Sequence, residues 1–205
     1  AAGVKVEILD KFLLDFSVSD LISYELLIAQ DGTDIFTDPR DGQTYATVDI
    51  GNQTWFAENL NYETPNSAWY DNISENGDIY GRLYTWGAAL TACPSGSHLP
   101  SDEEWTQLSE FLGGMEIAGG KMKEMGTDHW KSPNTGATNE SGFTALPGGN
   151  YSNNDFGGLG GGTWWWSSAE NGSEAFCWAV IFNFEYLSVL DQKKERKFSI
   201  RCIKD

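Results

Sequence analysis

The sequence predicts an α+β domain, and three observations lead to that class. A strand pair precedes two helical stretches, and strand-like runs return towards the C-terminal end, so strands and helices are segregated along the chain. Glycine is abundant, with 23 residues in a chain of 205, and short polar residues fill the segments between elements. Such segments form turns and long loops, because glycine adopts positive φ but contributes no packing.

The composition indicates a packed core and an acidic surface. Hydrophobic residues make up 40% of the chain and aromatic residues 14%, which is typical of a folded protein. The formal net charge is −17 at pH 7, so nucleic acid and anionic membranes are disfavoured as partners. The basic residues cluster in residues 191–201, where Asp191 and Glu195 interrupt them, so a solvated turn is a simpler interpretation than a binding patch.

No apolar run is long enough to cross a bilayer, so the sequence predicts no transmembrane segment. The first residues also lack a basic region followed by a hydrophobic stretch, and we expect that a secretory signal has been removed. The compartment therefore has to be inferred from chemistry.

Residues 1–35 differ in composition from the rest of the chain. They are aliphatic and contain no tryptophan, and the alternation across residues 4–8 predicts a strand, whereas residues 20–30 fit a helix or a strand equally. The turn-rich residues 31–43 mark a boundary. The sequence is therefore divided into an N-terminal strand or helix appendage of uncertain role, residues 1–35, and a main domain, residues 36–205.

The first elements of the main domain are a hairpin and a helix. Residues 44–50 and 53–60 are strand candidates joined across Gly51 and Asn52, which predicts a hairpin. Residues 61–81 are polar and irregular and are expected to form a loop with aromatic anchors. Residues 82–93 are expected to form the first helix.

The second helix has the clearest local signal. Ser101 and Glu104 have the spacing of a capping box, and Gly113 and Gly114 mark the end of the helix. The expected apolar face consists of Trp105, Leu108, Phe111 and Leu112.

A long region and a group of strands complete the domain. Residues 119–162 are too long for an ordinary connection, so we expect them to be functional or internally anchored, with Trp130, Phe143 and Phe156 as anchors. Short strands are then expected in "WWWSS", "AFCWAVIFNF", "YLSVL" and "KFSIRCI".

The cysteines allow several interpretations. A nucleophilic Cys93 with His98 as base needs a third orienting group, and the spacing shows none, so a structural role is favoured. Zinc is not supported, because no C-x-x-C or H-x-x-x-H spacing occurs. A bridge between Cys93 and Cys202 would close a long loop, which is worth about 4 to 5 kcal/mol. Three single bridges are possible, and the residues alone do not choose among them.

Other site motifs are weak. The carboxylates of Asp71, Glu75 and Asp78 are candidates for calcium, but they lack the EF-hand spacing, so a solvated acidic loop is the simpler interpretation and no cofactor is predicted. With 30 acidic residues in the chain, any carboxylate pair chosen for glycoside hydrolysis is uninformative. The run "GGLGGG" is not a phosphate loop, because no Lys-Ser/Thr pair follows it.

Several motifs resemble one known family over residues 36–205. They are "FTDPRDGQTYATVDIGNQTWFAENLNYET", "YGRLYTWGAAL", "CPSGSHLPSDEEW", "GFTALPGG", "WWWSSAE" and "FSIRCIKD". Their order is similar to that of the Fibrobacter succinogenes major paralogous domain. The resemblance implies a C-type-lectin-like fold, with two helices packed on short antiparallel sheets and long loops. It also implies a disulfide between Cys93 and Cys202, with Cys177 left as a buried thiol.

The family resemblance also implies a cellular context. Its members are expected to be secreted or attached to the cell surface, often as lipoproteins of Bacteroidetes-like bacteria. The fold is shared with formylglycine-generating enzymes and with variable ligand-binding proteins diversified by retroelements. Calcium-dependent sugar binding is not implied, because this sequence has "SPN" at residues 132–134 and "FNFE" at residues 182–185. Formylglycine-type catalysis is not implied, because Cys177 has no partner cysteine nearby in the sequence.

These inferences lead to a prediction of function. We expect a non-enzymatic extracellular module for ligand binding or adhesion, with a glycan or a surface protein as ligand. The alternatives are a subunit that assembles into a cell-surface structure and a degenerate relative of formylglycine-generating enzymes. The predicted ligand contacts are amides and aromatic rings of the loops and the final strands: Asn150, Tyr151, Asn153, Asn154, Asp155, Trp164, Trp178 and Tyr186.

Overall fold

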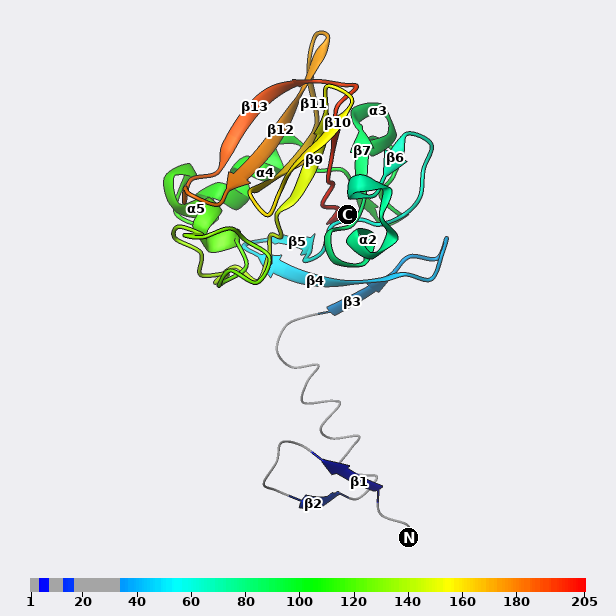
Figure 1. Cartoon of the computed structure of the whole chain (residues 1–205), viewed down its shortest axis with the longest axis vertical. Helices are drawn as coiled ribbons and strands as arrows, with labels where there is room; N and C mark the ends of the chain where they lie inside the picture. Colours follow the sequence, from blue (N-terminus) through cyan, green and yellow to red (C-terminus); the bar gives the residue numbers. More distant parts are fainter. Residues whose placement is uncertain (1–3, 8–12, 17–33) are drawn as a thin grey trace. The chain divides into compact units, whose positions relative to one another are not determined.

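The computed structural model describes residues 4–7, 13–16 and 34–205 of the chain. The chain divides into two compact units, Ala1–Asp34 and Ile35–Asp205, each described here by itself. Figure 1 shows both units coloured along the sequence.

The first unit contains an antiparallel strand pair. Strand β1 (Val4–Glu7) pairs with β2 (Leu13–Phe16), and Val4 lies opposite Phe16. The strand predicted at residues 4–8 is therefore present as β1. The element expected at residues 20–30 lies outside the described residues.

The second unit contains a five-stranded sheet that includes the predicted hairpin. The strands run in the order β3-β4-β5-β15-β8. Strand β4 pairs antiparallel with β5 across the turn at Gly51, whose φ is 67°. The hairpin prediction is confirmed. The bounds are β3 (Asp34–Thr37), β4 (Thr44–Ile50), β5 (Gln53–Phe56), β15 (Ile203–Lys204) and β8 (Ser97–His98).

An eight-stranded sheet lies above β4 and β5 in Figure 1. Its order is β13-β12-β11-β9-β14-β7-β6, with β10 paired to β9. The expected antiparallel pairing holds for most strands, but β11 pairs parallel with β9 at Thr163 and Gly149. The bounds are β6 (Ser67–Ala68), β7 (Leu83–Thr85), β9 (Gly148–Ser152), β10 (Asp155–Leu159), β11 (Gly162–Asn171), β12 (Glu174–Ile181), β13 (Ser188–Lys193) and β14 (Lys197–Phe198).

The helices differ from the two that the sequence predicts. The helix expected at residues 82–93 is only α3 (Trp86–Ala89), because β7 occupies the start of that segment. Two further helices occur in segments expected to be irregular, α2 (Ser74–Tyr80) and α5 (Met115–Met122), and a 3₁₀ turn precedes α2 at Tyr70–Asn72. The chain is mixed α+β, with more strands than helices.

Helix α4 (Asp102–Phe111) begins with the predicted capping box. The Ser101 hydroxyl accepts from the Glu104 amide, and the Glu104 carboxylate accepts from the Ser101 amide at 2.7 Å. Trp105 and Leu108 are buried, as expected for the apolar face. The prediction is wrong for Phe111, which is 64% exposed; it covers the hairpin turn, where a Cβ on Gly51 would lie 3.1 Å from its ring.

Tryptophans fill the core between α4 and the two sheets. Trp105 packs against Trp55 at 4.8 Å between ring centres and against Trp165 at 5.7 Å. The expected loop anchors Trp130 and Phe143 are also buried in this cluster. Rings of this size contribute most of the buried apolar area of a core, so the long region is anchored internally.

Two buried cations hold the long region in place. The Lys123 ammonium donates to the carbonyls of Thr135 and Phe184 at 2.8 Å each. The Arg201 guanidinium donates to the carbonyls of Phe143 at 2.6 Å and Thr144 at 3.0 Å. Buried carbonyls without donors are costly, so these contacts fix the loop against the strands around it.

Candidate functional site

A two-residue turn connects β9 and β10 and presents asparagine side chains. Asn153 and Asn154 have φ of 54° and 64°, and Ser152 pairs with Asp155 across the turn. This is the backbone of a tight hairpin turn with two residues at positive φ, a conformation that asparagine tolerates better than most residues. Both side chains are exposed, so their amides are free to meet a ligand.

Tyr151 joins this hairpin to β14. It pairs with Lys197 in the sheet, and the Lys197 ammonium lies 5.3 Å from the centre of the Tyr151 ring. The ring also meets Phe156 edge-on at 4.9 Å. Burial lowers the pKa of Lys197.

The turn between β13 and β14 carries basic residues. Lys194 is held in place, because its ammonium contacts the Glu170 carboxylate at 2.5 Å and lies 4.5 Å from the Trp86 ring centre. The Arg196 amide donates to the Lys193 carbonyl at 3.0 Å, and its guanidinium donates to the Gln192 side chain. The anchored Lys194 thus fixes the turn while Lys193 remains exposed.

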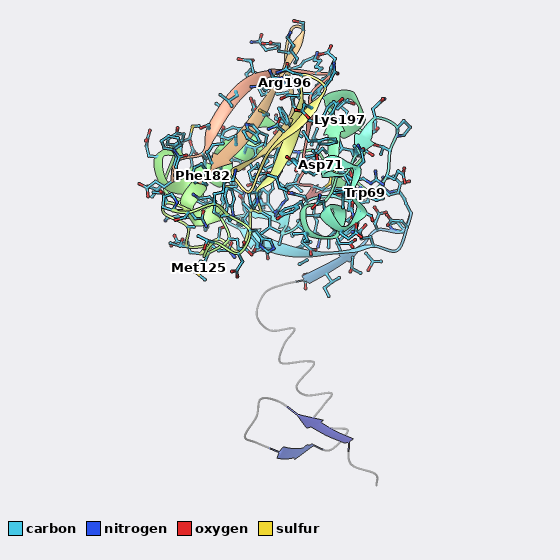
Figure 2. The ribbon with its side chains drawn as sticks, viewed as in Figure 1. Trp69, Asp71, Met125, Phe182, Arg196 and Lys197 are labelled. Atoms are coloured by element: carbon cyan, nitrogen blue, oxygen red, sulfur yellow. A yellow bond between two sulfur atoms is a disulfide. The ribbon has the colours of Figure 1, made fainter. Side chains whose placement is uncertain are left out.

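The two turns face each other across a cleft of about 190 Å³, which we call the turn cleft. Figure 2 labels Arg196 and Lys197 at this edge of the sheet. Two basic residues and one acidic residue line the cleft in a chain of net charge −17, so this is a locally basic site. The lining residues are Tyr151, Ser152, Asn153, Asn154, Lys193, Glu195 and Arg196.

The structure brings together part of the predicted ligand contacts. Tyr151, Asn153 and Asn154 line the turn cleft, and Asp155 follows them at the start of β10. Asn150 and Trp164 lie against Gly158: a Cβ built there would be 3.3 Å from the Asn150 amide nitrogen and 3.1 Å from the Trp164 ring. They neighbour the same hairpin without lining the cleft.

Three predicted contacts have other surroundings. Trp178 is 3% exposed, stacks on Trp105 at 5.9 Å and donates to the Asp102 carboxylate at 2.9 Å, so it supports the core and presents no ring to a ligand. Trp164 is half-buried and stacks on Phe198 at 6.3 Å. Tyr186 stacks on Phe184 and precedes β13, whereas the turn cleft lies beyond the other end of that strand.

The sequence interpretation missed Lys193 and Arg196 as site residues. The sequence favours a solvated turn for this run, because acidic residues interrupt it. The available signal was the cluster of basic residues itself, which is unusual in so acidic a chain. The position of this basic run opposite Asn153 and Asn154 depends on the pairing of β14 with β9, and no local sequence pattern indicates that pairing.

The cysteines and His98 have structural surroundings. A disulfide joins Cys93 to Cys202, and Cys177 is a buried free thiol. Burial raises the pKa of the Cys177 thiol, whereas a nucleophilic cysteine needs a lowered pKa. His98 lies between carboxylates, with Nδ1 2.7 Å from Asp205 and Nε2 2.8 Å from Glu104.

The structure does not bring the calcium candidates Asp71, Glu75 and Asp78 together as a metal site. Glu75 and Asp78 lie on α2, and Asp71 lies in the 3₁₀ turn before it. In residues 34–205 and the two strands of the first unit, no group of three or more His, Cys, Asp or Glu side chains could hold a metal ion. The described residues also include no helix long and apolar enough to cross a membrane.

The fold and the turn cleft define a disulfide-linked α+β domain with a polar, locally basic cleft on two turns. The family model of the Fibrobacter succinogenes major domain matches residues 48–204, and the chain belongs to this family. No curated protein and no solved structure matches the chain.

Proposed function

We propose that residues 36–205 form a non-enzymatic extracellular binding module with a C-type-lectin-like fold, which binds an acidic glycan in the turn cleft. The observation that carries the proposal is the meeting of Lys193 and Arg196 with Asn153 and Asn154 across one cleft. Guanidinium and ammonium groups attract carboxylates or sulfates, and amide side chains direct hydrogen bonds to hydroxyls. The Tyr151 ring adds an apolar surface for a sugar face.

The proposed location rests on the disulfide. Structural disulfides persist in oxidising compartments such as the cell exterior. The Cys93–Cys202 disulfide closes a sequence separation of 109 residues, so it constrains much of the domain. We place the protein outside the cell or attached to its outer surface.

Binding to a glycan array tests the proposal directly. Uronate-containing and sulfated oligosaccharides should bind, and their neutral counterparts should not. The variant K193Q/R196Q should lose binding, while the control K121Q/K131Q removes the same charge outside the turn cleft and should retain it. Binding to surface proteins but to no glycan would replace the glycan with a protein ligand, and no binding to either would refute the proposal.

A second candidate is a structural subunit in which the N-terminal segment docks onto a neighbouring molecule. The observation that favours it is the separation of Ala1–Asp34 from the rest of the chain as its own compact unit. Deleting residues 1–34 should then leave the second unit folded and abolish assembly. An unfolded deletion product would contradict this candidate.

A further inference from the structure

A second cleft, of about 160 Å³, lies beside α2 and the segment that follows β5. We call it the arginine cleft. It shares no lining residue with the turn cleft. The lining residues that matter here are Tyr45, Glu58, Asn61, Asp78, Thr144 and Arg201.

Arg201 supplies a buried positive charge to this cleft. It is 1% exposed, and its Nε donates to the Asn59 side-chain oxygen at 2.7 Å. Its Nη2 donates to the Thr144 carbonyl at 3.0 Å, which leaves a further N–H on that nitrogen. Within the described part of the chain no carboxylate forms an ion pair with it. Burial lowers the pKa of Arg201 to about 9, and the charge of Glu58 offsets this only in part, so the buried charge is incompletely compensated.

Tyr45 supplies a second buried donor. Its hydroxyl accepts from the Asn61 amide at 3.1 Å, and no described residue accepts the hydroxyl proton. Burial raises the pKa of Tyr45 to about 12, so the proton stays on the hydroxyl at neutral pH. The residue is 1% exposed and lines the arginine cleft. The buried side of the arginine cleft therefore offers donors to an anionic group.

Carboxylates occupy the exposed side of the same cleft. Glu58 and Asp78 are both exposed, and neither forms an ion pair with a cation among residues 34–205. Glu58 accepts from the Ala46 amide through one oxygen at 2.8 Å, which leaves its other oxygen available. The arginine cleft therefore has a positive interior and a negative rim.

We propose that the arginine cleft binds a free α-amino acid, with its carboxylate towards Arg201 and Tyr45 and its ammonium towards Glu58 and Asp78. The two charges of the ligand then match the two charged sides of the cleft. A ligand with only a carboxylate is repelled by Glu58 and Asp78 at the rim, and a ligand with only an amine is repelled by Arg201 inside. Both should therefore bind more weakly than a zwitterionic amino acid.

The test is an NMR titration of the ¹⁵N-labelled full chain with a panel of free amino acids, with acetate and methylamine as single-charge probes. At millimolar ligand, an amino acid should shift the amide signals around residues 58–61 and 78–81, and the two probes should bind at least about tenfold more weakly. Equal binding of acetate or methylamine, or no shift with any amino acid, would overturn the proposal.

Two variants and a control complete the test. E58Q/D78N changes only exposed side chains, and Y45F removes the hydroxyl that accepts from the Asn61 amide and whose proton would go to the ligand; each should weaken binding about tenfold. The control D71N/E75Q removes the same number of exposed carboxylates outside the cleft and should bind like the parent. If Y45F fails to fold, E58Q/D78N alone decides, and unchanged affinity there would contradict the proposal. Glycan binding at the turn cleft is measured separately and does not depend on this result.

Discussion

The Lys197 ammonium lies 5.3 Å from the centre of the Tyr151 ring and joins the hairpin of β9 and β10 to β14. Because β14 directly follows the basic turn, this contact sets that turn opposite Asn153 and Asn154. A cation over an aromatic ring contributes about 0.5 to 1 kcal/mol at an exposed site. The contact therefore links the geometry of the turn cleft to two strands that are distant in sequence.

Substitutions of Asn154, in the turn between β9 and β10, should separate effects on stability from effects on ligand binding. Asn154→Gly should leave the free energy of unfolding within about 0.5 kcal/mol of the parent, because glycine tolerates positive φ. Asn154→Ala should cost about 1 kcal/mol or more, because alanine lacks the short polar side chain with which asparagine tolerates positive φ. Both variants remove the amide and should weaken glycan binding. Urea unfolding and glycan titration check the two effects, and an alanine variant as stable as the glycine variant would contradict the turn assignment.

The disulfide should be a major contribution to stability. Cys93→Ser with Cys202→Ser should lower the free energy of unfolding by about 4 to 5 kcal/mol, because the cross-link closes a long loop in the unfolded chain. Urea unfolding measures the loss. Non-reducing peptide mapping should find Cys93 joined to Cys202, and Cys177 joined to either would contradict the pairing.

His98 should make stability depend on pH from 6.5 upward. Partial burial lowers the pKa of His98, but hydrogen bonds to Asp205 and Glu104 outweigh it and raise the pKa above its usual 6.5. The charged form is therefore favoured by folding, and its stabilisation is complete below 6.5 and lost as pH rises through the folded-state pKa. His98→Gln should remove this pH dependence. If the urea midpoints of the parent and the variant changed with pH in the same way, the role assigned to His98 would be contradicted.

Lys123 should act in the opposite direction at alkaline pH. Burial lowers its pKa from 10.5 to about 8, although Glu185 opposes the shift. Between these values the unfolded chain binds the extra proton, so the contribution of Lys123 to stability rises with pH across this window. Comparing urea unfolding of the parent and Lys123→Met isolates this contribution from the tyrosines. A parent and variant with the same slope would contradict the pKa shift.

Local signals predicted the elements that local chemistry determines. The capping box of α4 and the hairpin of β4 and β5 depend on neighbouring residues, and both are present. Helix α5 was not predicted, because Gly119 and Gly120 suggest a loop. They serve close packing instead: a Cβ on Gly119 would lie 2.5 Å from the Tyr186 carbonyl oxygen, and one on Gly120 would lie 2.4 Å from that of Gly136.

The candidate site was predicted on one side only. The turn at Asn153 and Asn154, and so their exposure, can be predicted from the sequence, because asparagine favours tight turns. The basic side depends on the long-range pairing of Lys197 with Tyr151, and the burial of Trp178 depends on its stacking with Trp105. An aromatic-rich strand pattern does not distinguish a ring in the core from a ring at the surface.

Chemical-shift mapping with an acidic oligosaccharide tests the central claim most directly. Titrating the ¹⁵N-labelled chain with a uronate-containing oligosaccharide should shift the amide signals of residues 151–154 and 193–197 together. The K193Q/R196Q variant should lose these shifts while K121Q/K131Q keeps them. Shifts confined to another surface, or no shifts with any acidic glycan, would contradict the assignment of the turn cleft as the binding site.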